Sequence, residues 1–418
     1  MGRAAHSSGR TTMLTRRSFV KRAAMGTAAA AWVPAGGTAS PSSLNDRADI
    51  EVKVGKTVEI THSFRYCWYP TIHRFPSGEI MVTMRMSPDE VNPEGDFSAY
   101  CLSADGGSIW SQRYTMGAGA NVDGAFSDAM PSDGSIWQLY GWVASAPMAG
   151  RGESFHLTLT KFAKGGMEFQ QLRDVPLEMS VPVHYDSTDL FDRRVQDGRL
   201  AKQATVVPWG PILEGLDGSL IAPVYYTTEQ SQTYYRLALI RSADAGKSWK
   251  EYSTVAAVEP GEKPWPGMGR EGPCETGLVR LADKRLYAIF RTGGDGFMGH
   301  TWSADDGKTW TKPASTPHQG VAVRVRRISN GMLACTTGRP GPVVVMFSAE
   351  GTGEKWQGIT PLFEGKSTHY TDFIEVEPGK LLVVYDSVPY GWHPIPFSDR
   401  DSRNVIYGTF VEVRRAGH

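Results

Sequence analysis

The chain has 418 residues, with 44 basic and 44 acidic side chains and many glycine and aromatic residues. The first forty residues carry six basic side chains and no acidic one, so the rest of the chain is mildly acidic and has no basic stripe. This charge distribution argues against a nucleic-acid partner, and no apolar run is long enough to span a bilayer.

The N-terminal segment resembles a twin-arginine export signal. "TRRSFVK" at Thr15–Lys21 precedes the alanine-rich "AAMGTAAAAWV", and small residues follow around Ala35–Ser40. A short basic helix on the domain is the alternative. We expect residues 1–40 to be a cleaved signal, 41–55 to be a linker with an N-terminal strand, and 56–415 to be one domain. The mature protein would then be periplasmic or extracellular.

Six segments of the chain are predicted to form β-hairpins. In each, two runs of alternating apolar residues flank a turn that contains Gly or Asp, which is typical of paired strands. No segment keeps a helical period over several turns. The six segments are Thr71–Met84, Asp128–Trp142, Gly210–Tyr226, Thr276–Arg291, Arg324–Arg339 and Asp372–Asp386.

A second phrase follows the hairpins. It reads "SADGGSIW" at Ser103–Trp110, "SADAGKSW" at Ser242–Trp249 and "SADDGKTW" at Ser303–Trp310, with a degenerate copy at Ser348–Trp356. We expect its Asp to accept hydrogen bonds from the amides of its own turn and its Gly to supply a positive φ. We expect its Trp ring to be buried beneath the turn. The phrase would then join the third and fourth strands of a sheet.

Six such four-stranded antiparallel sheets around one axis predict an all-β, six-bladed β-propeller. A β-sandwich with unrelated Asp-Gly turns is the alternative. The four cysteines, which we expect to be mostly free and buried, show no metal-binding spacing: Cys67, Cys101, Cys274 and Cys335.

The phrase "SxDxGxTW" is the Asp-box, and Asp-boxes on a six-bladed propeller resemble the sialidase (neuraminidase) superfamily. The resemblance covers most of the chain after about residue 55. It implies a Tyr nucleophile activated by a Glu, an Asp acid/base and three Arg that hold the substrate carboxylate, with no metal or organic cofactor. A neutral Tyr suits this chemistry because the anomeric carbon bears a carboxylate that would repel a charged nucleophile.

The resemblance assigns roles in the last three hairpins. In "GPCETGLVRLADKRLYAIFR", Glu275 would be the base and Arg291 a clamp residue. In "TTGRPGP", Arg339 would be the second clamp residue. In "HYTDFIEVEPGKLLVVYD", Tyr370 would be the nucleophile, and Asp386 stands where the family often has a Glu that orients an Arg. Each of these residues could instead have a purely structural role, such as an ion pair or an aromatic side chain at the edge of a blade.

The first hairpin departs from the family. "CWYPTIHRF" matches the family's Phe-Arg-Ile-Pro phrase at Pro70, so Trp68 holds the position of the first clamp Arg. Arg65 has the opposite strand parity to Trp68, but it could reach in from the entering loop and is counted among the substrate-binding residues. Arg74 has the right parity but lies about 20 Å further along the strand. A Trp at this position suits stacking on a sugar face, which puts the identity of the substrate in doubt.

The acid/base is expected in the loop "MSPDEVNPEGDF", where Asp96 fits the family spacing best and Asp89 is the reserve. Arg270 and Glu271 lie near Glu275 in the sequence and would line the site. His73, His300 and His369 are taken as structural histidines.

The leading hypothesis is therefore an exported, monomeric, retaining exo-glycoside hydrolase that releases a terminal acidic sugar from a glycan. Two alternatives stay open. One is a propeller hydrolase or lyase that acts on a neutral or uronate-containing polysaccharide. The other is a non-catalytic propeller that binds a glycan or a protein.

Overall fold

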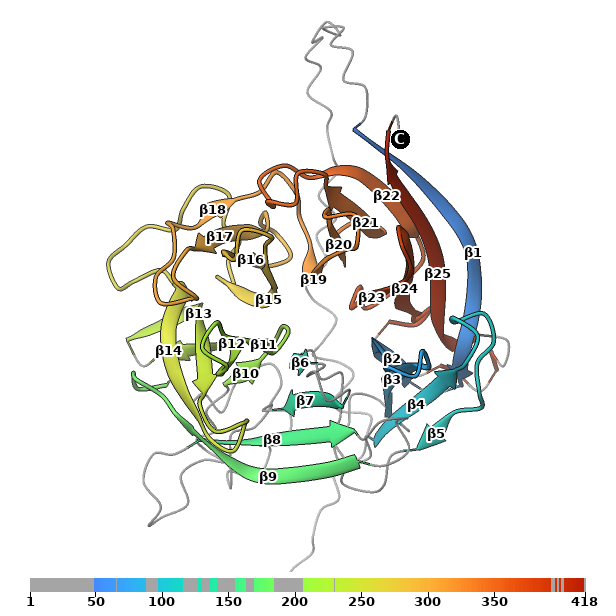
Figure 1. Ribbon diagram of the computed structural model, residues 1–418, viewed down its shortest axis with the longest axis horizontal. Coiled ribbons are helices and arrows are strands. Elements are labelled where there is room, and N and C mark those ends of the chain that lie inside the picture. The colour runs from blue at the N-terminus through green and yellow to red at the C-terminus, as the bar shows by residue number, and fades with distance from the viewer. Residues whose placement is uncertain are drawn as a thin grey trace, which may run out of the picture. The chain divides into compact units, whose positions relative to one another are not determined.

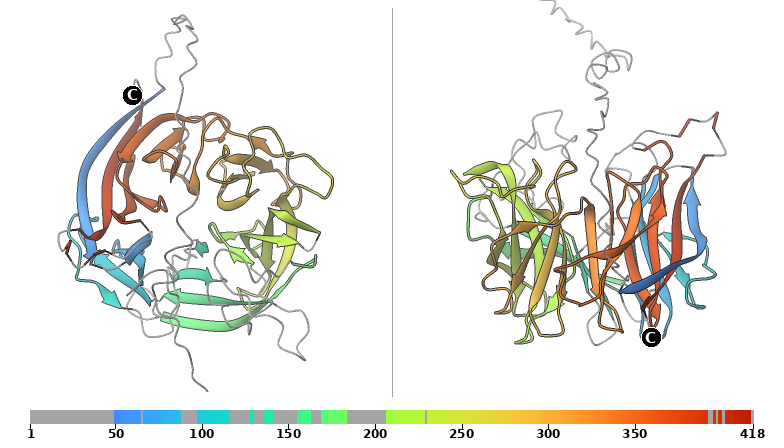
Figure 2. Two further views of the ribbon diagram at one scale, coloured as in Figure 1. Left: turned by 180° about the vertical axis from the view of Figure 1, so that it is seen from behind. Right: turned by 90° about the horizontal axis from the view of Figure 1, so that it is seen from above.

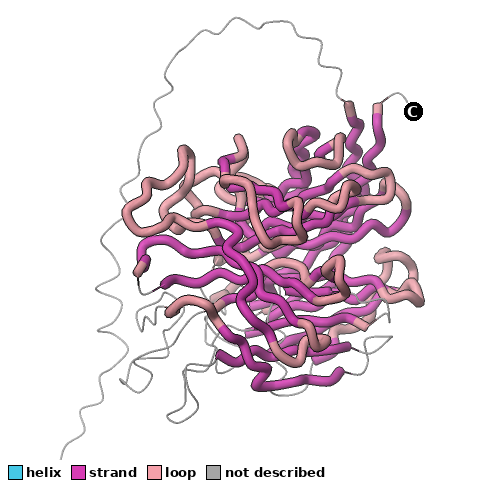
Figure 3. The backbone as a smooth tube through the Cα atoms, turned by 60° about the vertical axis from the view of Figure 1, so that its left-hand side comes forward, coloured by secondary structure: helices cyan, strands magenta, loops and turns pink. Residues whose placement is uncertain are grey.

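The computed structural model describes residues 49–64, 66–87, 97–115, 127–129, 135–140, 155–162, 169–183, 206–228, 230–391, 395–396, 398–399 and 402–416. None of these residues is helical, and strands account for most of them (Figure 3). The described part of the chain accordingly contains no helix of the length and apolarity that a membrane crossing needs.

Four of the sheets have four strands each, all antiparallel. The first holds β2 (Tyr66–Arg74), β3 (Ile80–Ser87), β4 (Phe97–Ser103) and β5 (Tyr114–Thr115). The next two hold β15 (Cys274–Arg280), β16 (Leu286–Arg291), β17 (Gly299–Ser303) and β18 (Ala314–Ser315), and then β19 (Val321–Arg327), β20 (Leu333–Gly338), β21 (Val343–Ser348) and β22 (Gln357–Phe363). The last holds β23 (Asp372–Glu377), β24 (Lys380–Ser387), β25 (Asn404–Arg415) and β1 (Ile50–Ser63).

The fifth sheet has nine strands in two antiparallel groups. One group is β6 (Ser127–Ala129), β7 (Ile136–Tyr140), β8 (Phe155–Phe162) and β9 (Phe169–Glu178). The other is β10 (Val207–Pro208), β11 (Leu213–Glu214), β12 (Leu220–Thr228), β13 (Ser231–Ser242) and β14 (Trp249–Ala256). A short parallel contact joins the groups, in which Trp249 pairs with Leu177 and Lys250 with Glu178.

Within the unit Arg47–His418, the sheets follow one another around a ring (Figures 1 and 2). The predicted all-β fold of four-stranded antiparallel sheets is confirmed. The predicted number of six blades stays a prediction, because the structure has five sheets and a count of six requires the two groups of the nine-stranded sheet to be taken as separate blades.

Each of the six predicted hairpins contains an antiparallel pair of strands. The pairs are β2–β3, β6–β7, β11–β12, β15–β16, β19–β20 and β23–β24. The first member of each pair is the innermost or near-innermost strand of its sheet, so these hairpins supply the side chains that face the axis.

The Asp-box joins the third and fourth strands of its sheet, as predicted. In the copy between β17 and β18, Asp305 accepts hydrogen bonds from the Thr309 amide at 2.9 Å and from the Ser303 hydroxyl at 2.8 Å. Gly307 has a φ of +87° and donates its amide to Ser303 Oγ at 2.8 Å. The tryptophans are not buried equally, since Trp249 is fully buried and Trp310 is half-buried.

The chain closes the ring by pairing its two ends. β1 is the outer strand of the last sheet and runs antiparallel to β25 over Ile50–Ser63. Part of this strand falls in the range 41–55, in which a linker and an N-terminal strand were expected. Apolar side chains fill the space between neighbouring sheets. One cluster, for example, joins Leu382 and Val384 of the last sheet to Val82 and Met84 of the first.

Three inner strands have a β-bulge near their start. Tyr69, Glu275 and Ala322 each lie at a register shift and have positive φ values of 54°, 29° and 49°. A residue other than glycine in this conformation costs about 1–3 kcal/mol. These bulges lie at the same end of β2, β15 and β19, so they shape one face of the ring, which we call the mouth.

A cluster of buried charges lies on the inner strands, further along the axis from the mouth. Asp372 is fully buried and accepts hydrogen bonds from Arg326 Nη2 at 2.8 Å and from the Ile72 amide at 3.1 Å. Arg324 lies 3.6 Å from Asp128, and His73 Nε2 lies 3.5 Å from the other oxygen of the same carboxylate. Four inner strands (β2, β6, β19 and β23) contribute to this cluster, so it ties together sheets that are distant in the sequence.

Candidate active site

Three of the predicted side chains meet at the mouth. The Tyr370 hydroxyl donates a hydrogen bond to Glu275 Oε1 at 2.9 Å, and Arg291 Nη1 donates to the same oxygen at 2.8 Å. Tyr370 and Glu275 are 95 residues apart in the chain. Only the ring arrangement of the sheets brings them together.

Both carboxylate oxygens of Glu275 accept hydrogen bonds. Its Oε2 accepts the backbone amide of Ala322 at 2.9 Å, and its side chain is almost fully buried. Since both Glu275 and Ala322 have positive φ, the hydrogen bond links the bulges of two neighbouring inner strands. Strain of this kind persists only where surrounding contacts over-determine it, and it concentrates at functional sites.

The surroundings of Tyr370 favour its neutral form. Burial raises the pKa of the Tyr370 phenol well above its ordinary value, the Glu275 carboxylate raises it further, and the charge of Arg291 opposes them. The phenol is therefore protonated, and it donates its hydrogen bond to Glu275, a carboxylate that can accept a proton. Proton transfer must accompany any attack by this oxygen.

Aromatic rings enclose the phenol. Tyr69 meets Tyr370 edge-on with ring centroids 4.7 Å apart, and Trp209 lies 5.4 Å from it. Tyr225 is next, 6.4 Å from Trp209. Tyr69, Trp209 and Tyr225 were not among the predicted site residues. A sequence signal existed for the first two, since Tyr69 directly precedes a proline within β2 and Trp209 begins the phrase Trp-Gly-Pro between β10 and β11.

Arg339 lies near the same phenol. Its Nη2 donates to the backbone oxygen of Thr368 at 2.8 Å, and its charge acts to lower the pKa of both Tyr370 and Tyr69. Its own φ of +55° and the cis Arg339–Pro340 bond mark the sharp turn that the sequence indicated. Among the described residues, no carboxylate forms an ion pair with Arg339.

Arg291, unlike Arg339, has carboxylate partners among the described residues. Besides bonding Glu275, its Nη2 donates to Glu271 at 2.8 Å, so both terminal nitrogens already have carboxylate partners. Glu271 lies in the site, as predicted. Arg270, its neighbour in the sequence, is largely exposed and lies 3.8 Å from Asp295. A substrate carboxylate would have to share Arg291 with two protein carboxylates.

Asp386 does not face the open site. It is fully buried and accepts hydrogen bonds from the Thr368 amide at 2.8 Å and from the Tyr69 amide at 3.1 Å. Because Arg339 bonds to the carbonyl of Thr368, Asp386 orients Arg339 through the backbone of that residue. The predicted orienting role therefore fits the geometry, whereas a direct contact with substrate does not.

The stacking face predicted for Trp68 is not open in this structure. Its ring is fully buried between Tyr66, at 4.4 Å, and Tyr69, at 5.1 Å. The register shift after Trp68 reverses the expected parity, so that Tyr69 is the residue whose ring meets Tyr370. Arg85, which pairs with Trp68 across β2 and β3, is buried, and its charge acts on the Tyr69 phenol. It is a cationic residue of the site that sequence reasoning missed.

The remaining predicted residues divide into three groups. Arg65, Asp89 and Asp96 lie outside the described residues. Arg74 donates to the backbone oxygen of Val376 at 2.8 Å at the far end of β2. His73 belongs to the buried charge cluster, His300 packs against Trp302, and His369 precedes Tyr370 with a φ of +65°.

The described residues include no group of three or more His, Cys, Asp and Glu side chains that could hold a metal ion. The four cysteines are all buried and unbonded to one another.

Comparison with known proteins agrees with the repeats and the fold. Residues 158–383 match the family described as the BNR repeat-like domain, and because this match covers more than half of the chain, the protein belongs to that family. No curated protein matches the sequence.

Solved structures share the fold at low identity. A protein of unknown function from Dyadobacter fermentans DSM 18053 has a TM-score of 0.67 at 20% identity, covering 87% of this chain and 99% of that one. Hadza microbial sialidase Hz136 has a TM-score of 0.56 at 14% identity, covering 84% and 68%. The α-L-arabinanase of Penicillium chrysogenum, solved with arabinobiose, has a TM-score of 0.56 at 14% identity, covering 85% and 98%.

The predicted resemblance to the sialidase superfamily is therefore confirmed for the repeats and the propeller fold. Identities this low carry no information on the substrate or on the role of any residue.

Proposed function

We propose that the protein is an exported, sialidase-like, retaining exo-glycoside hydrolase that releases a terminal acidic sugar from a glycan. One observation carries the proposal: the 2.9 Å hydrogen bond from the Tyr370 hydroxyl to Glu275, in a buried, aromatic-walled site flanked by arginines. A nucleophile bonded to its base, with cations beside it, is the arrangement that covalent catalysis requires.

In the proposed reaction, Tyr370 Oη attacks the anomeric carbon while Glu275 takes the phenol proton. The bond from that carbon to the leaving oxygen breaks, and Asp96 protonates the oxygen. Water then attacks the anomeric carbon and Asp96 takes its proton. The bond from that carbon to the Tyr370 oxygen breaks, and Glu275 returns a proton to this oxygen. Two displacements at one carbon retain its configuration.

The substrate carboxylate would lie against Arg339, whose charge has no acidic partner among the described residues, and would share Arg291. A charged nucleophile would be repelled by this carboxylate, whereas the neutral phenol of Tyr370 is not.

A second candidate is a hydrolase or lyase acting on a neutral or uronate-containing polysaccharide. Two observations favour it: Trp68 occupies the place of an expected clamp arginine, and the arabinanase shares the fold. A non-catalytic glycan-binding propeller is the third candidate. The Tyr370–Glu275 hydrogen bond argues against it.

The test is a panel of fluorogenic sialosides, arabinosides, rhamnosides and uronides, assayed with the wild type, Tyr370→Phe and Tyr407→Phe. Tyr407 lies on β25, which β24 separates from the inner strand β23, so its variant is the control. We expect release from the sialoside that falls at least about 1,000-fold in Tyr370→Phe and is unchanged in Tyr407→Phe. Turnover of only another sugar, or an unsaturated product that absorbs ultraviolet light, would select the second candidate.

A further inference from the structure

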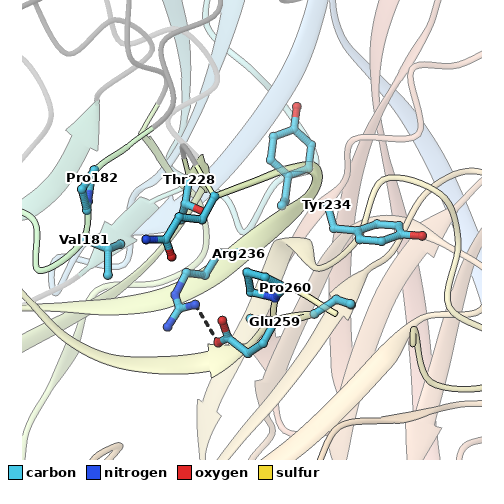
Figure 4. Close-up of a pocket in the computed structure, with 11 residues that line it drawn as sticks. Val181, Pro182, Thr228, Tyr234, Arg236, Glu259 and Pro260 are labelled. Carbon is cyan, nitrogen blue, oxygen red and sulfur yellow. Dashed lines mark hydrogen bonds and ion pairs between the residues drawn. The ribbon is translucent and has the colours of Figure 1, made fainter. Parts of the chain in front are cut away.

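A pocket outside the candidate active site lies at the mouth side of the nine-stranded sheet. Its walls come from the residues after β9, the end of β12, the start of β13 and the loop after β14, represented by Pro182, Thr228, Tyr234 and Pro260 (Figure 4). Its volume is about 150 Å³. Sites that bury a whole ligand measure roughly 300–1,000 Å³, so this pocket is sized for one group of a larger molecule.

The charges in the pocket cancel. Arg236 Nη1 donates to Glu259 at 2.7 Å, as Figure 4 shows, and its Nη2 donates to Thr254 Oγ1 at 2.6 Å. Because one carboxylate balances one guanidinium, the pocket offers no net attraction to an anion. It still offers hydrogen bonds, since the Glu259 side chain is 49% exposed.

The other walls mix apolar and hydroxyl-bearing groups. Val181, Pro182 and Pro260 supply apolar surface, and the half-buried Tyr234 supplies an aromatic ring. Thr228 and Gln230 supply a hydroxyl and an amide. An uncharged sugar ring complements such walls, because its C–H faces make apolar contacts and its hydroxyls form hydrogen bonds with charged and amide groups.

The pocket shares a wall with the candidate active site. Tyr235, which lines the pocket, meets Tyr225 edge-on at 4.9 Å, and Tyr225 lies close enough to Glu275 and Tyr370 for both to raise its pKa further, beyond the larger effect of burial. The Tyr235 amide also donates to the backbone oxygen of Glu271 at 2.9 Å, whose carboxylate bonds Arg291.

We propose that this pocket is a subsite for an uncharged sugar further along the glycan whose terminal acidic sugar binds beside Tyr370. The inference rests on the proposed function for the identity of the terminal sugar. It adds a recognition site that makes an oligosaccharide a better substrate than a simple glycoside.

The test compares two substrates with the same acidic sugar and different leaving groups: 3′-sialyllactose and 4-methylumbelliferyl sialoside. Tyr234→Ala and Glu259→Ala should each lower kcat/KM for the trisaccharide by about 10-fold, which corresponds to about 1.4 kcal/mol, and leave the fluorogenic substrate within about two-fold. The matched control is Tyr252→Ala, on β14 of the same sheet but outside the pocket. No change, or an equal change for both substrates, would overturn the subsite.

A binding measurement separates failure of the subsite from failure of the proposed function. Lactose, cellobiose and arabinobiose are titrated into Tyr370→Phe and followed by saturation-transfer NMR, which requires no turnover. Binding of at least one disaccharide that disappears in the Tyr234→Ala background supports the subsite even where neither sialoside is hydrolysed. Absence of saturable binding for all three would overturn it even where the sialosides are substrates.

Discussion

Glu275 connects three parts of the candidate site. One oxygen accepts from Tyr370 and Arg291, and the other accepts from the Ala322 amide. A carboxylate with this many donors is fixed in position before a substrate arrives, which lowers the reorganisation needed during reaction.

Glu275→Gln is expected to keep the shape of this side chain and remove its basicity. The amide cannot take the Tyr370 proton, so kcat should fall about 100-fold or more, with KM changing less. Steady-state kinetics on the substrate found in the panel measures this. Glu271→Gln is the control, because Glu271 bonds Arg291 and not the phenol. A kcat for Glu275→Gln within about three-fold of the wild type would contradict the assignment.

The site residues that could be predicted lie in regular strands or just beside them. Glu275, Arg291 and Tyr370 follow from hairpin position and family resemblance. At Trp68 and Tyr69, prediction from hairpin position fails, because one bulge changes which of two adjacent side chains faces the axis. A bulge depends on contacts with other sheets, and here the Tyr69 amide is held by Asp386, 317 residues away. No local sequence pattern records that contact.

At the scale of the element, the Asp-box is a turn that satisfies its own polar groups. Asp305 accepts hydrogen bonds from Ser303 and Thr309, and these bonds lower its pKa from 3.8 to about 2, led by the Thr309 hydroxyl and amide. All of these bonds are local, so the sequence alone predicts them.

Asp305→Ala should lower the free energy of unfolding by about 1 kcal/mol at pH 7. The pKa of Asp305 is lower in the folded than in the unfolded state, so the ionised carboxylate stabilises the fold above pH 3.8 and this contribution is lost as the pH falls toward 2. Urea unfolding of wild type and variant at pH 7 and pH 2.5 measures the difference. Lys308→Ala, an exposed change in the same turn, is the control. If the difference in free energy of unfolding between wild type and variant were larger at pH 2.5 than at pH 7, the prediction would be contradicted.

At the scale of the whole molecule, long-range contacts hold the ring together. β1 pairs with β25 across more than 340 residues, and the buried charge cluster joins four inner strands. Although burial acts to raise it, the guanidiniums of Arg326 and Arg324 keep the pKa of Asp372 below its ordinary value. The carboxylate is thus ionised inside the protein.

Asp372→Asn is expected to destabilise the fold by about 3–5 kcal/mol, because it removes the only carboxylate paired with Arg326 among the described residues and takes one carboxylate partner from the buried Arg324. Chemical denaturation measures this loss. Glu377→Gln is the control, because Glu377 forms an exposed ion pair with Lys380 that contributes about 0–1 kcal/mol. A loss below about 1 kcal/mol for Asp372→Asn would show that the cluster does not hold the sheets together.

The N-terminal segment allows a separate prediction for the whole chain. Replacing both Arg16 and Arg17 with Lys should keep the precursor in the cytoplasm, while the wild type appears outside the cytoplasmic membrane with a new N-terminus between Val33 and Ser43. Cell fractionation and N-terminal sequencing measure both. Arg10→Lys lies outside the paired arginines and should be exported normally. Full export of the double variant would exclude the twin-arginine route.

The sequence by itself determined the features that depend on short-range physics. Alternation of apolar residues set the six hairpins, and the hydrogen-bonding capacity of Ser, Asp and Gly set the Asp-boxes and hence the class of fold.

Only the tertiary structure decided which side chains meet. It brought Glu275 to Tyr370, placed Asp386 behind Arg339, buried Trp68 and left Arg339 without an acidic partner among the described residues. The physical reason is that these outcomes depend on bulges, on burial and on ring closure, each set by contacts between residues that are tens to hundreds of positions apart.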